Sequence, residues 1–107
     1  MTASELLDRY EAMWRLTQDM LAAARQANWD RLVEIEQTRT AIVGELKRED
    51  RILWQAEEGS KKEILIRAIL AADTEIKALT ESWMGELQGA LGTIGAQQKL
   101  KKAYGAI

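Results

Sequence analysis

Apolar residues recur every three or four positions through the first part of the chain, which is the period of an amphipathic helix. Thr2 and Glu5 fit a capping box, in which two side chains satisfy backbone amides at the start of a helix. The pattern therefore predicts a helix over residues 3–27 with one broad buried face. Its apolar stripe contains Leu6, Tyr10, Met13, Thr17, Met20 and Ala24.

A second stripe predicts a helix over residues 29–58. Asn28 suits both the end of the first helix and the N-cap of the second, and Asp30 suits the positive end of the next helix dipole. Nothing between residues 47 and 51 breaks a helix, so we expect the helix to continue to Glu58. The stripe contains Leu32, Ile35, Arg39, Ile42, Leu46 and Leu53.

Arg39 interrupts this second apolar stripe, and two interpretations are open. In one, the arginine makes a polar contact that sets specificity. In the other, its aliphatic stem packs in the seam while the guanidinium reaches water.

Gly59 and Ser60 mark the next predicted boundary. Glycine commonly ends a helix, and Ser60 with Glu63 forms a second capping-box pattern. A third helix is therefore expected over residues 61–84. Its seam contains Leu65, Ile69, Ala72, Ile76, Leu79 and Trp83.

The last part of the chain has a weaker helical pattern. Residues 85–95 contain four glycines, each of which costs a helix about 1 kcal/mol relative to alanine. We expect residues 86–103 to form a further helical segment that folds back, overhangs the bundle or pairs with a second copy. The predicted fold class is all-α, an antiparallel bundle of three long helices in a single domain over residues 1–107, with this segment at its end.

Composition narrows the classes of function. The 107 residues include no proline, cysteine or histidine, so the chain lacks thiol nucleophiles, the usual general base near neutral pH and most ligands of transition metals. We expect no enzyme activity, no metal site and no cofactor. The formal net charge of −2 favours neither nucleic acid nor an anionic membrane, and no apolar run is long enough to enter a bilayer. The lack of cysteine fits the cytoplasm.

The third predicted helix carries more apolar surface than one seam requires. Ile66 and Leu70 lie beside that seam and, with Val43 and Leu46 on the preceding helix, are candidates to line a groove for a partner's amphipathic helix. The alternative is a central helix that packs on two sides. A weakly helical C-terminal segment that covers this groove in the free protein would act as an autoinhibitor, which a partner displaces. The apolar residues of that predicted segment are Leu87, Leu91 and Ile94.

Tyr104 lies close to the C-terminus. It follows Leu100 by four residues, so it either anchors the same apolar face or, beside Lys101 and Lys102, docks onto a partner.

Several marked positions occur in an order typical of one family. The second helix opens with Ala27-Asn28-Trp29-Asp30, followed by Glu36 and Arg39; the third carries Ile69-Leu70-Ala71-Ala72-Asp73-x-Glu75-Ile76; the chain closes with Lys102-Ala103-Tyr104-Gly105. Over nearly its whole length the sequence resembles the FliT-type flagellar type III export chaperones.

The resemblance implies a small cytoplasmic helical bundle. Such a protein binds the C-terminal region of the filament cap protein FliD, prevents its premature assembly and delivers it to the export gate component FlhA. Some members also bind the export ATPase complex. The resemblance further implies that Tyr104 contributes to docking at the export gate. The alternative function is a homodimeric coiled-coil scaffold or adaptor without a secretion client.

Overall fold

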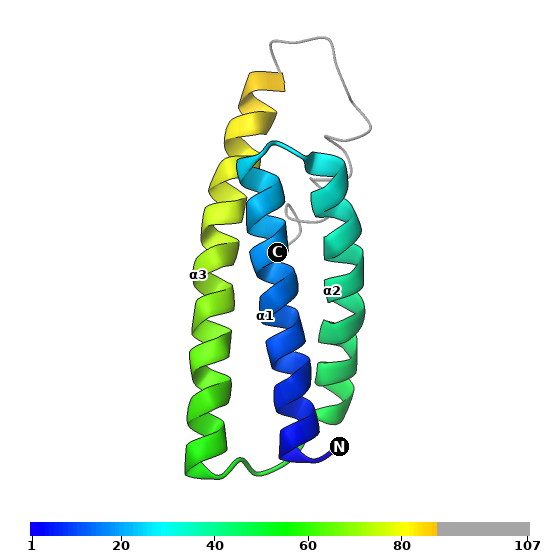
Figure 1. The fold of residues 1–107 in the computed structure, drawn as a ribbon, viewed down its shortest axis with the longest axis vertical. Helices are drawn as coiled ribbons and strands as arrows, with labels where there is room; N and C mark the ends of the chain where they lie inside the picture. Colours follow the sequence, from blue (N-terminus) through cyan, green and yellow to red (C-terminus); the bar gives the residue numbers. More distant parts are fainter. Residues whose placement is uncertain (88–107) are drawn as a thin grey trace.

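The computed structural model describes residues 1–87, which form three long helices (Figure 1). They are α1 (Ala3–Arg25), α2 (Trp29–Glu49) and α3 (Ala56–Leu87). Successive helices run antiparallel, and α1 lies between α2 and α3 and packs against both. For the residues described, the predicted all-α bundle of three helices is confirmed.

The first helix begins as predicted. Thr2 Oγ1 accepts a hydrogen bond from Glu5 N at 3.2 Å, and Glu5 Oε1 accepts one from Thr2 N at 3.2 Å, which completes the capping box. In the turn to α2, Asn28 Oδ1 accepts a hydrogen bond from Arg31 N at 3.3 Å and so caps the second helix. The left-handed residue of this turn is Ala27, with φ 56°. Asn28 therefore caps the start of α2, but it does not supply the left-handed residue that follows α1.

The boundary between the second and third helices differs from the prediction. α2 ends at Glu49 and not at Glu58, while α3 begins at Ala56, about one and a half turns before the predicted start at residue 61. Gly59 and Ser60 therefore lie inside α3 and do not form a helix boundary. The predicted capping box at Ser60 is wrong.

Asp50 explains where the second helix stops. Its carboxylate accepts hydrogen bonds from Tyr10 Oη of α1, from Trp54 Nε1 at 2.8 Å and from Lys62 Nζ of α3 at 2.5 Å. These bonds hold the connection, residues 50–55, across the end of the bundle. Leu53 consequently points away from the seam predicted for it, and its side chain is 99% exposed.

Buried apolar residues form two clusters along the bundle. The closed cluster lies where α1 ends, α2 begins and the second half of α3 passes them, and the open cluster lies at the opposite end. The closed cluster contains Met20, Ala23, Ala24, Trp29, Leu32, Ile35 and Ile76. The open cluster contains Leu6, Tyr10 and Leu46, with the partly buried Met13, Ile42, Ile52, Trp54, Leu65 and Ile66 packed against them.

α3 continues through Gly85 to Leu87, slightly beyond its predicted end. Of the predicted segment over residues 86–103, only the first two residues are described. The candidate residues that lie outside the described part of the chain are Leu91, Ile94, Lys101, Lys102 and Tyr104. Within residues 1–87, no helix combines the length and apolar character needed to cross a membrane.

Candidate functional site

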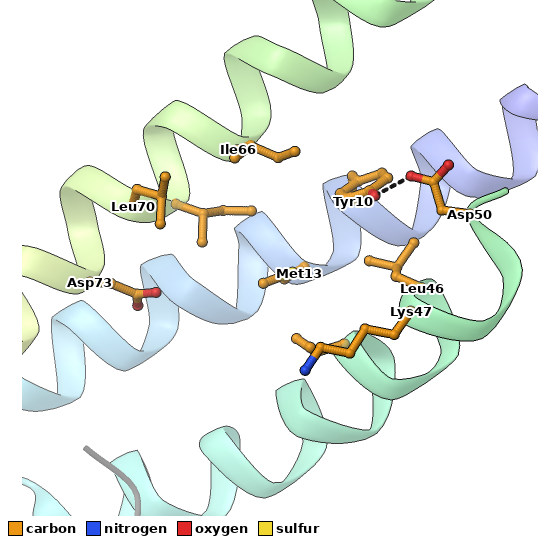
Figure 2. A pocket seen from close by; sticks show the side chains of 10 residues that line it. Tyr10, Met13, Leu46, Lys47, Asp50, Ile66, Leu70 and Asp73 are labelled. Carbon is orange, nitrogen blue, oxygen red and sulfur yellow. Dashed lines mark hydrogen bonds between the residues drawn. The ribbon is translucent and has the colours of Figure 1, made fainter. Parts of the chain in front are cut away.

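An apolar groove runs along α1 between α2 and α3 (Figure 2). It encloses a cavity of about 360 Å³. All four residues predicted to line a partner's groove are brought together here: Val43 and Leu46 from α2, and Ile66 and Leu70 from α3. The remaining lining residues are Tyr10, Met13, Lys47, Asp50, Ile69 and Asp73.

The groove exists because α1 supports both of its walls. α2 and α3 each pack along α1, whereas within residues 1–87 their backbones do not approach one another closely. Tyr10 and Met13 of α1 therefore form part of the groove surface between them. Leu70 remains 59% exposed on the α3 wall, so apolar surface beside the cavity is open to solvent. A surface of this kind is suited to contact with apolar side chains of another segment.

One end of the groove is fixed by the Asp50 network. Besides its hydrogen bonds from Tyr10, Trp54 and Lys62, the network places Lys62 Nζ 4.8 Å from the Trp54 ring centroid and 5.3 Å from that of Tyr10. The Tyr10 and Trp54 rings meet edge to face, with centroids 6.3 Å apart. α1, the connection and α3 are thus held together at this end.

The network also shifts two pKa values. Burial acts to raise the pKa of Asp50, but the hydrogen bonds from Lys62, Tyr10 and Trp54 lower it overall, because each donor favours the ionised carboxylate. Burial and the neighbouring Asp50 carboxylate raise the pKa of Tyr10, so its hydroxyl keeps its proton and acts as a donor. The network is therefore neutral in sum, with one ammonium facing one carboxylate.

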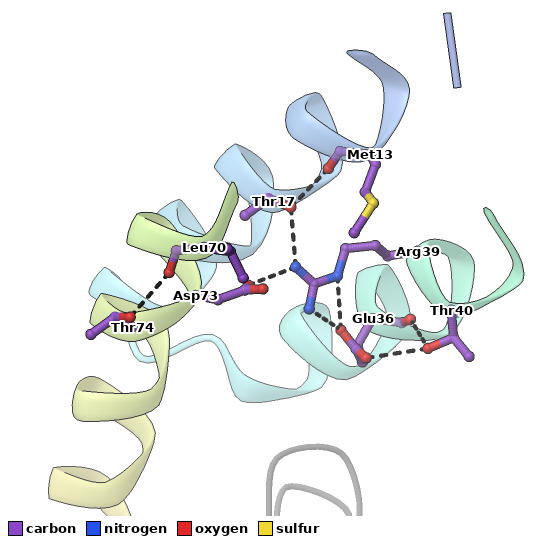
Figure 3. A network of polar contacts seen from close by, with 8 residues as sticks. All are labelled: Met13, Thr17, Glu36, Arg39, Thr40, Leu70, Asp73 and Thr74. Atoms are coloured by element: carbon purple, nitrogen blue, oxygen red, sulfur yellow. Dashed lines mark hydrogen bonds and ion pairs between the residues drawn. The ribbon is translucent and has the colours of Figure 1, made fainter. Parts of the chain in front are cut away.

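Arg39 forms a polar layer at the other end of the groove (Figure 3). Its Nη1 donates to Asp73 Oδ1 of α3 at 2.6 Å and to Thr17 Oγ1 of α1 at 3.1 Å. Its Nη2 pairs with Glu36 Oε2 at 3.0 Å, and Thr17 in turn donates to Met13 O at 2.8 Å. Arg39 is only 5% exposed, so the interpretation in which its head reaches water is wrong.

The sequence signal for this layer includes Thr17, which the prediction counted as part of the apolar stripe, in addition to Arg39. Thr17 and Arg39 each interrupt an otherwise apolar stripe, one on each of the first two helices. Two polar interruptions at matching depth in neighbouring helices indicate a buried hydrogen-bonded pair, because buried polar groups require partners. Asp73 gave no such signal, since it flanks the seam of the third helix.

A second hollow adjoins the groove at the start of α3. It is lined by Trp54, Gly59, Lys62, Glu63, Ile66 and Arg67, and so shares Ile66 with the first. In the part of the chain that the structure describes, no group of acidic side chains is placed to hold a metal ion. The chemistry that this arrangement supports is the binding of an apolar segment.

The fold and the groove together define a small helical bundle with an open apolar groove. The family model for flagellar protein FliT matches residues 7–106, which is nearly all of the sequence. The chain belongs to the FliT family of flagellar proteins.

Three curated relatives agree with this assignment. The flagellar protein FliT of Cronobacter sakazakii is 28% identical over 105 residues, and that of Yersinia enterocolitica is 29% identical over 103. The flagellar protein FliT of an Enterobacter species is 24% identical over 106 residues. Each alignment covers 94% of this chain and 84% of the relative. No solved structure matches the chain significantly.

Proposed function

We propose that this protein is a cytoplasmic flagellar export chaperone whose groove holds an amphipathic helix of its client. The observation that carries the proposal is the groove itself: an apolar surface, lined from all three helices, in a member of a flagellar family. A client helix laid along α1 would complete a four-helix arrangement and bury Leu70 and Ile66. The family resemblance makes the C-terminal region of the filament cap protein FliD the expected client.

The proposed chaperone activity follows from the apolar face of the client that the groove would cover. A client segment in the groove cannot use the same apolar face to assemble with other subunits, so premature assembly is prevented. Delivery to the export gate component FlhA, and contact with the export ATPase complex, belong to the same proposal and rest on the resemblance alone.

The groove is tested by replacing Ile66 and Leu70 with serine. The double variant should keep its helical circular dichroism and lose most of its affinity for the FliD C-terminal segment, measured by calorimetry. Ile64→Ser is the matched control, because Ile64 is 67% exposed on α3 but lines neither hollow. A flagellin segment controls for client identity. Unchanged affinity in a folded double variant would move the client site elsewhere.

Autoinhibition is the next part of the proposal, and it concerns the residues after α3. The twenty residues that follow Leu87 would span about 30 Å as a helix, which is close to the distance from Leu87 back to Ile66 along α3. Truncation after Met84, which removes Leu87, Leu91 and Ile94, should therefore raise client affinity. A folded truncated protein with equal or weaker affinity would contradict autoinhibition and favour a segment that overhangs or pairs with a second copy.

Docking at the export gate is assigned to Tyr104 with its neighbours Lys101 and Lys102. Tyr104→Ala should keep client binding and a thermal midpoint within a few degrees, while losing most affinity for the FlhA cytoplasmic domain. Retained gate binding would contradict the docking role. A homodimeric scaffold, the alternative function, would instead show a concentration-dependent size and no client affinity.

A further inference from the structure

The two ends of the groove differ in their balance of charge. At the Asp50 end, the Lys62 ammonium faces one carboxylate. At the other end, one guanidinium faces two carboxylates, because Arg39 pairs with both Glu36 and Asp73. Counted over residues 1–87, this layer therefore holds one excess negative charge, and its Arg39 and Glu36 side chains are only 6% and 15% exposed.

Asp73 is the member of this layer that faces the groove. Its side chain is 29% exposed and lines the cavity, whereas Glu36 does not line it (Figures 2 and 3). Lys47 also lines the groove, but on the α2 wall beside Leu46 (Figure 2). An apolar occupant would remove Asp73 from water and make the excess charge costly, because an uncompensated buried carboxylate is strongly unfavourable.

We propose that the occupant of the groove carries a lysine or arginine that pairs with Asp73. The inference rests on the proposed function, since it assumes that an amphipathic helix lies along α3 in the groove. A carboxylate accepts several donors, so the occupant's cation can bind Asp73 while Arg39 keeps its own bond. Asp73 then determines the position along the groove at which the occupant binds, as well as the charge that the occupant must carry.

The register follows from helix geometry. Ile66, Leu70 and Asp73 lie on one face of α3, and seven residues separate the first from the last, about 10 Å along the axis. An occupant parallel to α3 therefore places apolar residues at i and i+4 and its cation at i+7. An antiparallel occupant places the cation first and the apolar residues three and seven positions later.

The test uses labelled amphipathic peptides with leucines at these spacings and one variable position. Two sets, one for each direction, carry lysine, glutamine or glutamate at the position that faces Asp73. Fluorescence anisotropy measures their affinity for the full chain. In one of the two sets we expect the lysine peptide to bind at least about threefold more tightly than the glutamine peptide, with the glutamate peptide weakest, and the difference to shrink at high salt.

Two variants assign this preference to Asp73. Asp73→Asn should remove the order among the three peptides. Glu75→Gln is the matched control, because it removes the same charge from the same helix at an exposed residue that pairs with Arg25 and lines no part of the groove. The control should keep the order of the unmodified protein.

The outcomes separate the inference from the proposed function. Equal affinities of the three peptides in both sets would overturn the proposed pairing of the occupant's cation with Asp73 and leave the groove as a client site. An order of affinities that is unchanged in Asp73→Asn would have the same consequence. No binding of any peptide overturns the groove, and with it the inference. If Asp73→Asn fails to fold, the affinities of the three peptides for the unmodified protein still show whether the groove prefers a cation at this position.

Discussion

The closed and open clusters use similar apolar residues but leave different surfaces. In the closed cluster, Met20, Leu32 and Ile76 are fully buried, and the Trp29 and Trp83 rings pack with centroids 4.7 Å apart. In the open cluster, Leu6 is as fully buried, yet Leu70, which lines the groove together with Tyr10 and Leu46 of this cluster, is mostly exposed. One end of the bundle therefore supplies stability, and the other keeps apolar surface available.

The Arg39 layer separates the two clusters. Arg39, Thr17 and Asp73 join all three helices by hydrogen bonds at the depth where apolar contacts are interrupted. Residues that do not share partners usually contribute independently to stability. Changes at the groove and changes in the closed cluster should therefore have nearly additive effects on the free energy of unfolding.

The largest expected effect comes from the closed cluster. Leu32→Ala removes a fully buried side chain from the closed cluster, which draws residues from all three helices, and should cost about 3–4 kcal/mol through lost transfer energy and a residual cavity. The thermal midpoint should fall by more than about 10 °C. Leu70→Ala is the matched control on the groove and should change stability by less than about 1 kcal/mol, because Leu70 is mostly exposed. Urea unfolding of both variants measures the difference, and equal losses would contradict the division between the clusters.

The second effect concerns the layer between them. Arg39→Met keeps most of the side-chain volume but leaves Glu36 and Asp73 without their shared cation. We expect a loss of about 2–3 kcal/mol, less than for a fully buried pair because Asp73 is partly hydrated. Arg31→Met is the control, since its pair with Glu34 at 3.7 Å is exposed and should be worth well under 1 kcal/mol. Equal stability of the two variants would mean that the layer contributes no more than a surface pair.

The sequence predicted the parts of this fold that depend on local signals. The start of α1 depends on Thr2 and Glu5, which are three residues apart, and the turn into α2 depends on Asn28 and its neighbours. The apolar period likewise identified the walls of the groove, since Ile66 and Leu70 lie beside the seam of α3. Such features need no knowledge of how the helices pack.

The predicted helix boundaries were wrong where contacts between residues far apart in the sequence determine the structure. α2 ends at Glu49, and the next residue, Asp50, is held by hydrogen bonds from Tyr10, forty residues earlier, and from Lys62, twelve residues later. No local breaker marks this position, and the capping pattern at Ser60 pointed to the wrong boundary. Arg39 shows the same limit, because its partner Asp73 lies on another helix and is thirty-four residues away.

The third effect, at the open end, depends on pH. The pKa of Asp50 is lower in the folded protein than its ordinary value near 4. The stabilisation is therefore present above about pH 4 and is lost as the pH falls through the lower folded pKa. Asp50→Asn should cost about 1–2 kcal/mol at neutral pH, because uncharged acceptors make weaker hydrogen bonds.

This cost should shrink below about pH 4, because the Asp50 carboxyl of the unfolded chain takes up a proton there before the carboxyl of the folded protein does. Urea unfolding at several pH values compares the two proteins. Glu45→Gln is the control, since Glu45 pairs with Arg9 at the surface and no comparable network surrounds it. A gap between Asp50→Asn and the unmodified protein that stays constant down to about pH 3 would contradict the network as the cause.

The smallest effect tests the corrected connection between α2 and α3. In the predicted helix over residues 29–58, Leu53 lies in the buried seam, and Leu53→Ser would then cost several kcal/mol. In the structure the Leu53 side chain is almost fully exposed, so the same change should alter the free energy of unfolding by less than about 0.5 kcal/mol. Its neighbour Ile52 packs on the open cluster, and Ile52→Ser should cost clearly more. Because the two residues are adjacent and similar in size, a larger loss for Leu53 than for Ile52 would show that the helix continues past Asp50 and would remove the basis for the Asp50 network.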